Sequence, residues 1–297
     1  MRTLHHTLYY PSRTTRLVFW HITDSHVGAA GCDEAMFKAD VESIASNPNA
    51  YWGFGGDACE CITRTGDKRF RESAIADWLY GVDDIVSEQI DRFISIIKPI
   101  AHKCLYFGMG NHEDSMLTHY NRDVYLELCR RVADAKGCEI GDVATGWESF
   151  IVLKFRRGTP EAYGGTTSMS LYYHHGAGGG RKLGGHALRL EDTMLRHEAD
   201  ICFLGHRHVR SYDEIVVNGP GRRAHQERRR GGIYGGSYLA THIPPAKNGM
   251  PRSTYPQTKQ LPALTVGMVP IIIKPDTLDW TPITAKNPRL MIEALTA

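Results

Sequence analysis

The sequence predicts an α/β protein whose β-sheets lie between layers of helices. In the first half of the chain, short apolar runs alternate with stretches of helical periodicity, whereas strand signals predominate in the second half. Hydrophobic residues make up 42% of the 297 residues and charged residues 23%, which is the balance of a globular chain with a packed core.

The first half begins with a polar segment, residues 1–15, that we expect to form an irregular N-terminal arm. Three short β-prone runs follow, and a cluster of glycine and polar residues stops each of them: 17–22, 50–54 and 104–107. Apolar residues at helical spacing predict helices over 33–46, 71–98 and about 117–136. Pro99 predicts the end of the second helix.

The second half is richer in strands, with one helix predicted over 186–197. The strand signals lie at 150–155, 168–173, 201–204, 209–217, 232–240 and 264–274. We expect residues 16–297 to form a single domain, in which 209–240 is a basic hairpin or loop region.

Composition excludes several classes of protein. Thirty-five Lys and Arg stand against 33 Asp and Glu, so a net charge of +2 favours no particular partner. No apolar stretch is long enough to span a membrane, and the N-terminus has no secretion signal, so we expect a cytoplasmic protein without a membrane partner. The seven cysteines are odd in number and scattered, which predicts reduced thiols.

Five of the predicted strands run into loops that carry Asp, Asn or His. The motifs are Asp24-x-His26, Gly56-Asp57, Gly110-Asn111-His112-Glu113, His174-His175 and Gly205-His206-Arg207-His208. Carboxylate, amide and imidazole donors without thiolate suit Mn, Fe, Co, Ni or Zn. Seven donors are too many for one tetrahedral ion, and they suffice for two ions if one carboxylate bridges them. The glycines allow the backbone to bend sharply or to approach the ions closely.

This ordered series resembles the motifs of the calcineurin-like metallophosphoesterase superfamily, and it covers residues 24–208. The resemblance implies a two-sheet sandwich flanked by helices (α/β/β/α), with two divalent ions at the strand ends. It implies that Asp24, His26, Asp57 and His208 hold one ion. It assigns Asp57, Asn111, His174 and His206 to the other, so that Asp57 bridges. His112 is then the catalytic histidine beside the substrate phosphate.

Two assignments need a choice between neighbours. Of the adjacent His174 and His175, we predict that His174 is the ligand, because the family often places a ligand directly after a strand and shortly before a turn; His175 is then expected to contact substrate. We also expect Glu60, three residues after Asp57, to orient His112, as an acidic residue at that spacing does in phosphoprotein phosphatases. The alternative for Glu60 is an ordinary residue at a helix start.

The resemblance implies a phosphoester hydrolase that uses a hydroxide activated by two metal ions. The phosphoprotein phosphatase signature GDxVDRG is absent, because Gly56-Asp57 continues as Ala58-Cys59-Glu60-Cys61, so we favour a phosphodiesterase over a phosphomonoesterase. Seven arginines within 207–230 have two interpretations, a contact with a nucleic acid or nucleotide substrate or an ordinary solvated hairpin loop. Arg181 and Arg207 are the candidate substrate contacts. The alternatives are a non-catalytic interaction scaffold on the same fold and a single-metal enzyme. The sequence does not determine the oligomeric state.

Overall fold

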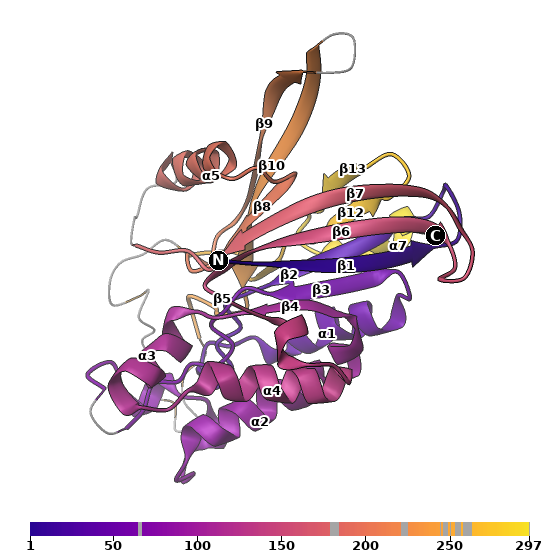
Figure 1. Cartoon of the computed structure of the whole chain (residues 1–297). Helices are drawn as coiled ribbons and strands as arrows, with labels where there is room; N and C mark the ends of the chain where they lie inside the picture. Colours follow the sequence, from indigo (N-terminus) through magenta and orange to yellow (C-terminus); the bar gives the residue numbers. More distant parts are fainter. Residues whose placement is uncertain are drawn as a thin grey trace.

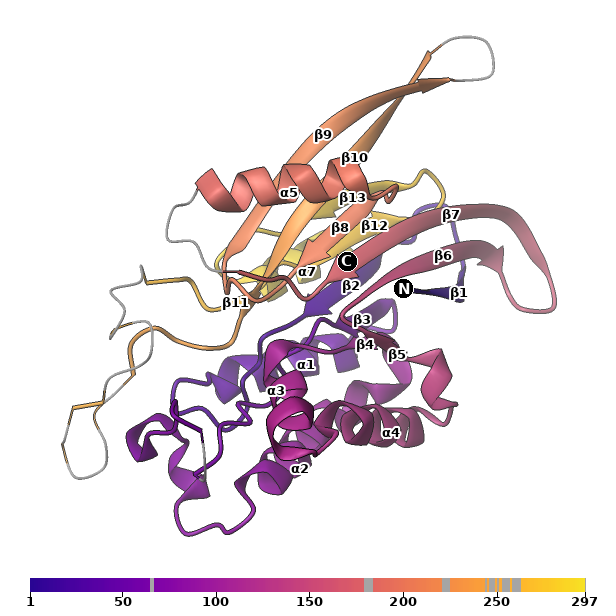
Figure 2. The same ribbon diagram turned by 60° about the vertical axis from the view of Figure 1, so that its left-hand side comes forward.

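The fold is an α/β sandwich of two mixed sheets, which confirms the predicted fold class. The computed structural model describes the chain except for residues 65–66, 179–183, 221–224, 244, 246–248, 250, 253–256, 258–262 and 297. Within the described residues there are a seven-stranded and a six-stranded sheet and six α-helices. The two sheets lie face to face in the middle of the molecule, and helices lie beyond both of them (Figures 1 and 2).

The six-stranded sheet has the order β13-β12-β2-β3-β4-β5. Its parallel part consists of β2 (Leu17–Ile22), β3 (Ala50–Phe54), β4 (Cys104–Gly108) and β5 (Ala144–Gly146). The antiparallel β12 (Ile271–Lys274) and β13 (Asp279–Pro282) complete it. The parallel strands β2, β3 and β4 are continuous apolar runs because both faces of this sheet are covered.

The seven-stranded sheet has the order β1-β6-β7-β8-β10-β11, with β9 paired to β10. Its strands are β1 (Arg2–Tyr10), β6 (Glu148–Gly158), β7 (Tyr163–His174), β8 (Ile201–Leu204), β9 (Arg210–Pro220), β10 (His225–Ser237) and β11 (Gly267–Met268). The parallel pair β7 and β8 has His174 opposite Leu204. The carboxyl ends of both strands therefore lie side by side at the same end of the sheet. The antiparallel β9 and β10 form a hairpin that projects from the body of the molecule (Figure 1).

The N-terminal segment is a strand and not the irregular arm that we predicted. Residues 2–10 pair in parallel with 149–157 along the edge of the seven-stranded sheet. Leu4, Leu8 and Tyr10 are buried, which is the period-2 pattern of a strand with one face in the core. The polar residues between them face outwards and gave this segment its loop-like composition.

Helices cover the outer faces of both sheets. Three of them lie beneath the six-stranded sheet (Figure 1): α1 (Glu34–Ser46), α2 (Ile85–Ile97) and α4 (Val124–Lys136). On the seven-stranded sheet, α5 (Gly184–Arg196) buries Leu190 and Met194 against Tyr172 and Tyr234. The short α7 (Pro288–Thr296) ends the described chain. A separate core between the sheets contains Phe19, Tyr106, Tyr173 and Phe203.

Two predicted helices are interrupted. Residues 71–98 contain the short 3-10 turns η1 (Glu72–Ala74) and η2 (Asp77–Leu79), and α2 begins only after Asp84, whose carboxylate accepts the backbone N–H of Ser87. Residues 117–136 contain the end of α3 (Asn111–Tyr120) and all of α4. Asn121 ends α3 in the left-handed conformation, with φ +53°, and so separates the two helices. Further 3-10 turns are η3 (Lys98–Lys103) and η4 (Ile140–Asp142).

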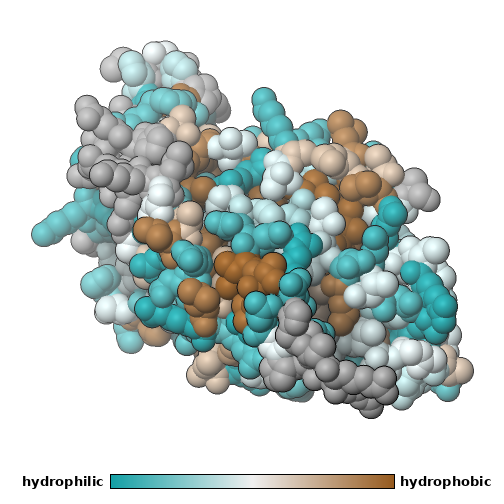
Figure 3. Space-filling model, turned by 90° about the horizontal axis from the view of Figure 1, so that it is seen from above, coloured by the Kyte–Doolittle hydropathy of each residue, from teal (hydrophilic) through white to brown (hydrophobic). Residues whose placement is uncertain are grey.

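The surface is mixed in polarity. Seen from above, brown apolar residues are set among teal polar ones (Figure 3). Large exposed apolar side chains include Leu188 and Leu195 on α5 and Val216 on β9. None of the described helices is long and apolar enough to cross a membrane. All seven cysteines are free thiols, and five of them are buried.

Candidate metal centre

The motif loops converge where the carboxyl ends of strands from both sheets meet. Asp24 and His26 follow β2, Asp57 follows β3, and Asn111 follows β4 at the start of α3. His175 follows β7, and His206 and His208 follow β8. Parallel strands bring their carboxyl ends to one edge of a sheet. The two sheets therefore contribute complementary halves of one buried site.

The first group of donor atoms consists of Asp24, His26 and His208. The Nε2 atoms of His26 and His208 lie 3.1 Å apart, and Nε2 of His208 lies 3.2 Å from Oδ1 of Asp24. Asp24 is held in place by the backbone N–H of His206 and the hydroxyl of Thr23, which donate to its carboxylate. Three donors thus surround one buried point.

The second group consists of Asp57, His175 and His206, whose donor atoms all lie within 4.8 Å of one another. Nε2 of His175 lies 3.3 Å from Oδ2 of Asp57 and 3.2 Å from Oδ1 of Asn111. Nδ1 of His175 donates to the carbonyl of Gly55 at 2.8 Å, so Nε2 is the nitrogen that faces the group. Asn111 therefore adds a fourth donor to this group.

A single oxygen of Asp57 lies between the two groups. Oδ2 is 3.3 Å from Nε2 of His175 in one group and 3.8 Å from Nε2 of His26 in the other. The second oxygen, Oδ1, accepts the backbone N–H of His112 at 2.9 Å. Asp57 is thus placed as a carboxylate that both groups share.

The structure brings His175, and not the predicted His174, to the centre. Side chains alternate between the two faces of a strand, so His174 shares the outer face with Tyr172, which packs under α5. Its Nδ1 accepts the backbone N–H of Gly176 instead. His175 is fully buried, which also corrects its expected role as a substrate contact. The phase of the strand at its end decides between the two neighbours.

We expected Glu60 to orient His112, but its side chain contacts a different histidine. Its carboxylate accepts Nδ1–H of His26 at 2.9 Å, so Nε2 of His26 faces the donor group. His112 is held instead by the backbone carbonyl of Glu60, which accepts its Nδ1–H. A third set of close donors, His26, Glu60 and His112, reflects these contacts. Glu60 therefore acts as the carboxylate behind a ligand candidate, the arrangement that fixes a metal-binding histidine.

Glu113 is the last residue of the Gly110–Glu113 motif, and its organising role was not predicted from the sequence. It is buried, and its carboxylate accepts three backbone N–H groups, from Asp57, Ala58 and Gly110. These contacts join the loop after β3 to the loop after β4. Its position at the third residue of α3, behind a glycine, is a capping-box signal that could have identified it.

The backbone of these loops adopts unusual conformations. Asp24, His26, Asp57, His206 and His208 all have φ between +47° and +66°. Non-glycine residues at positive φ are uncommon and concentrate at functional sites. Gly110 is required for a different reason, because a β-carbon there would lie 2.1 Å from Oδ1 of Asp57.

Burial and neighbouring charges shift the pKa values of the centre. Burial lowers the pKa of His26, but its hydrogen bond to Glu60 and the surrounding carboxylates outweigh this and raise it to about 9. Burial likewise opposes the effect of Asp57 on His175, whose pKa rises to about 10. Burial raises the pKa of Asp24, but His208 outweighs it and brings it to about 2. In the metal-free centre, the carboxylates are therefore paired with protonated His26 and His175.

These residues fit divalent cations. Carboxylates and imidazoles point their donor atoms at common positions, and in the metal-free chain protons on His26 and His175 offset the carboxylate charge. Asp24, His26 and His208 would hold one ion, and Asn111, His175 and His206 another, with Asp57 between them. Nitrogen and oxygen donors without sulfur suit Mn, Fe, Co, Ni or Zn.

The two other predicted substrate contacts are Arg207 and Arg181. Arg207 lies between His206 and His208 in the sequence. Burial raises the pKa of Tyr234, and the positive charge of Arg207 partly opposes this effect. Arg181 lies outside the described residues. Three arginines of the basic region have internal partners: Arg228 pairs with Glu198, Arg229 with Glu214, and Arg230 donates to the carbonyl of Met194.

A scan against protein-family models and a search of curated proteins found no match to this chain.

Proposed function

We propose that this protein is a metal-dependent phosphoester hydrolase of the calcineurin-like metallophosphoesterase type. The observation that carries the proposal is the position of Asp57, whose Oδ2 faces an imidazole nitrogen from each of two donor groups. Two-metal hydrolases clamp a phosphoryl group between neighbouring ions, and a shared carboxylate would hold two such ions side by side. The order of the motifs along the chain supports the same family.

Two divalent ions bound here would activate water for attack and offset charge on the phosphoryl oxygens. In the reaction a water oxygen forms a bond to phosphorus, the bond from phosphorus to the leaving oxygen breaks, and that oxygen takes up a proton. His112 is the residue of the chain that is placed to supply this proton. Its Nδ1–H donates to the carbonyl of Glu60, and its Nε2 forms no hydrogen bond with another described residue.

His112 is also oriented by its surroundings. Its backbone N–H donates to Asp57, and its ring packs edge-on against His26 with centroids 4.7 Å apart. The catalytic histidine and the shared carboxylate therefore keep a fixed relation. General acids at hydrogen-bond distance from the leaving group contribute about 10²- to 10⁴-fold to the rate.

We propose phosphodiesters, and not phosphomonoesters, as the preferred substrates. The chain lacks the signature of the phosphoprotein phosphatases, because Ala58 to Cys61 replace it. A diester leaves a second substituent on phosphorus, and the pocket described below offers room for one.

The direct test is a metal-reconstitution assay. Protein stripped with a chelator is reloaded with Mn, Zn, Fe, Co or Ni and assayed with bis-p-nitrophenyl phosphate and with p-nitrophenyl phosphate. We expect metal-dependent turnover, with the diester preferred, and its loss in Asp57→Ala. Two bound ions without turnover would favour a non-catalytic scaffold, and one bound iron with oxygen dependence would favour a single-metal enzyme.

A further inference from the structure

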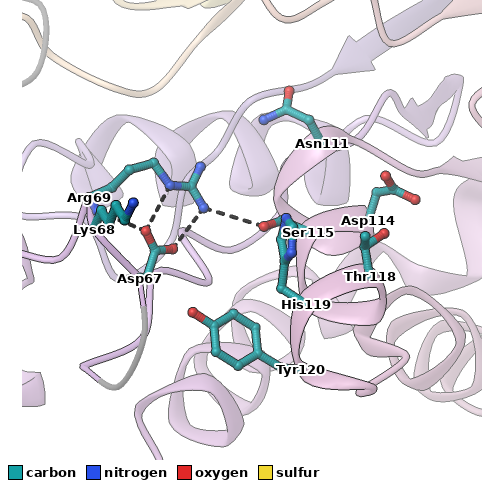
Figure 4. Close-up of a pocket in the computed structure, with 9 residues that line it drawn as sticks. All are labelled: Asp67, Lys68, Arg69, Asn111, Asp114, Ser115, Thr118, His119 and Tyr120. Atoms are coloured by element: carbon teal, nitrogen blue, oxygen red, sulfur yellow. Dashed lines mark hydrogen bonds and ion pairs between the residues drawn. The ribbon is translucent and has the colours of Figure 1, made fainter.

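A polar pocket of about 680 Å³ adjoins the candidate metal centre. Asn111 belongs to both, because it contacts His175 in the centre and lines the pocket with its neighbours on α3. The segment Asp67–Arg69 faces α3 across this pocket (Figure 4). A substrate group attached to a phosphoryl at the centre can therefore extend into it.

The α3 wall of the pocket carries hydrogen-bonding groups at helical spacing. Asn111, Ser115 and Thr118 recur four and three residues apart, so they share one face of the helix. Tyr120 closes the pocket at the end of α3 (Figure 4). A wall of amide and hydroxyl groups suits a polar ligand.

Arg69 lies at the opposite wall and is oriented there by hydrogen bonds. Its Nε and Nη2 donate to the two oxygens of Asp67 at 3.1 and 2.8 Å, and Nη2 lies 3.5 Å from the hydroxyl of Ser115. Nη1 has no partner among the residues that the structure describes. A guanidinium that is fixed on one edge and open on the other is prepared to bind an oxyanion.

The charges around Arg69 agree with this role. The carboxylate of Asp67 is already neutralised by the guanidinium. Lys68 adds a further positive charge to the lining, which offsets Asp114. Hydrogen bonds to Asp67 raise the pKa of Arg69, and the negative charge of Glu60 raises it further. The ion pair of Arg69 and Asp67 therefore lies within electrostatic range of the centre.

We propose that this pocket binds the part of the substrate next to the scissile phosphate, and that Arg69 binds a second phosphate there. The inference rests on the proposed function and makes it more specific. The substrate is a phosphodiester with phosphates on neighbouring units, such as an oligonucleotide. The pocket is larger than one phosphate needs, so it also has room for the connecting nucleoside.

The test uses the dinucleotides TpT, pTpT and TpTp, which differ only in a terminal phosphate, with the metal-loaded protein. Cleavage of the internucleotide bond is followed by chromatography. We expect pTpT or TpTp to be cleaved with at least tenfold higher kcat/KM than TpT. In Arg69→Ala this preference disappears through a rise in KM of about tenfold or more, the usual effect of removing a charged hydrogen bond. TpT and bis-p-nitrophenyl phosphate, which lack a second phosphate, should lose less activity in this variant than pTpT and TpTp do.

Arg131→Ala is the matched control, because Arg131 also forms an ion pair with an aspartate, Asp91 at 2.6 Å, but lies outside the pocket. It should retain the preference, and Arg69→Lys should restore part of it. A wild-type protein that cleaves all three dinucleotides equally overturns the inference, and so does an equal loss on every substrate in Arg69→Ala.

Failure of the proposed function gives a different result. In that case the wild-type protein cleaves no diester, with any metal. Calorimetric titration with pTpT then tests the pocket by itself: binding that Arg69→Ala abolishes supports the phosphate site, and binding that is absent or unchanged overturns it.

Discussion

The orientation of individual imidazole rings determines what the centre can bind. Nδ1 of His26 donates to Glu60 and Nδ1 of His175 donates to the carbonyl of Gly55. When these rings are neutral, each therefore presents the lone pair of Nε2 to Asp57. Partners behind a ligand fix its tautomer and commonly change metal affinity by about 10- to 100-fold.

The adjacent histidines after β7 give a sharp test at this scale. We expect His175→Ala to lose an ion from the group with Asp57 and to lose most of the hydrolytic activity. His174→Ala, one residue away, should keep both, because its ring lies outside the donor groups and accepts the backbone N–H of Gly176. Metal content by mass spectrometry and turnover of bis-p-nitrophenyl phosphate check both variants. The reverse pattern would restore the assignment made from the sequence.

His112 should affect catalysis without affecting metal binding. Its ring nitrogens lie outside the two donor groups around Asp57, so His112→Ala should retain the ions. We expect kcat to fall by about 10²-fold or more, as for the loss of a general acid. The fall in kcat should be smallest for substrates whose leaving group has a low pKa, because such a group departs without taking up a proton. Equal loss of metal and activity would show that His112 is a ligand.

Metal binding should depend on pH through the two histidines beside Asp57. Their pKa values, about 9 for His26 and about 10 for His175, lie above the ordinary value of 6.5. Both rings thus hold protons at pH 7 in the metal-free chain, and an ion must displace them. The stabilisation that these raised pKa values give the metal-free fold is complete below pH 6.5 and is lost as the pH rises through 9 to 10.

The expected outcome is that Mn²⁺ affinity rises between pH 6.5 and 8.5, by about tenfold per pH unit for each proton displaced. Calorimetry in buffers of different ionisation enthalpy measures the protons released. Affinity that does not change with pH would contradict the charge state described here.

At the scale of elements, the ends of strands and one helix start build the centre. Glu113, in the first turn of α3, accepts backbone N–H groups from both the β3 and the β4 loops. Its carboxylate fixes the loop that carries Asp57 relative to the helix that carries Asn111 and His112. The centre therefore depends on a residue that binds no ion.

We expect Glu113→Ala to lower the free energy of unfolding by about 3 kcal/mol or more, since each buried donor left without a partner costs about 1–3 kcal/mol. Metal affinity should fall as well. Urea denaturation measures the first effect and metal titration the second. Glu127→Ala is the control, because that half-exposed glutamate pairs with Arg122 at 3.3 Å and lies outside the centre. Equal stability of the two variants would contradict the role of Glu113.

The elements that the sequence predicted well are those with continuous apolar runs. Strands β2, β3, β4 and β8 are buried on both faces, and a polar turn ends each of them. The helix predicted over 71–98 was too long because apolar spacing continues through 3-10 turns before the cap at Asp84. The choice between His174 and His175 depends on strand phase at the last residue, which a composition pattern does not encode.

At the scale of the whole molecule, the centre connects the two sheets. The six-stranded sheet supplies Asp24, His26, Asp57 and Asn111, and the seven-stranded sheet supplies His175, His206 and His208. The ordered motifs made this convergence predictable from the sequence. Contacts between distant segments, such as the edge strand β1 beside β6 or the pocket between Arg69 and α3, depend on packing that no local pattern reveals.

A crystal structure of the Mn²⁺-loaded protein with an anomalous difference map would show whether two ions share Asp57. We expect two peaks, one beside His26 and His208 and one beside His175 and His206, with the Asp57 carboxylate between them. A single peak, or two peaks without Asp57 between them, would contradict it.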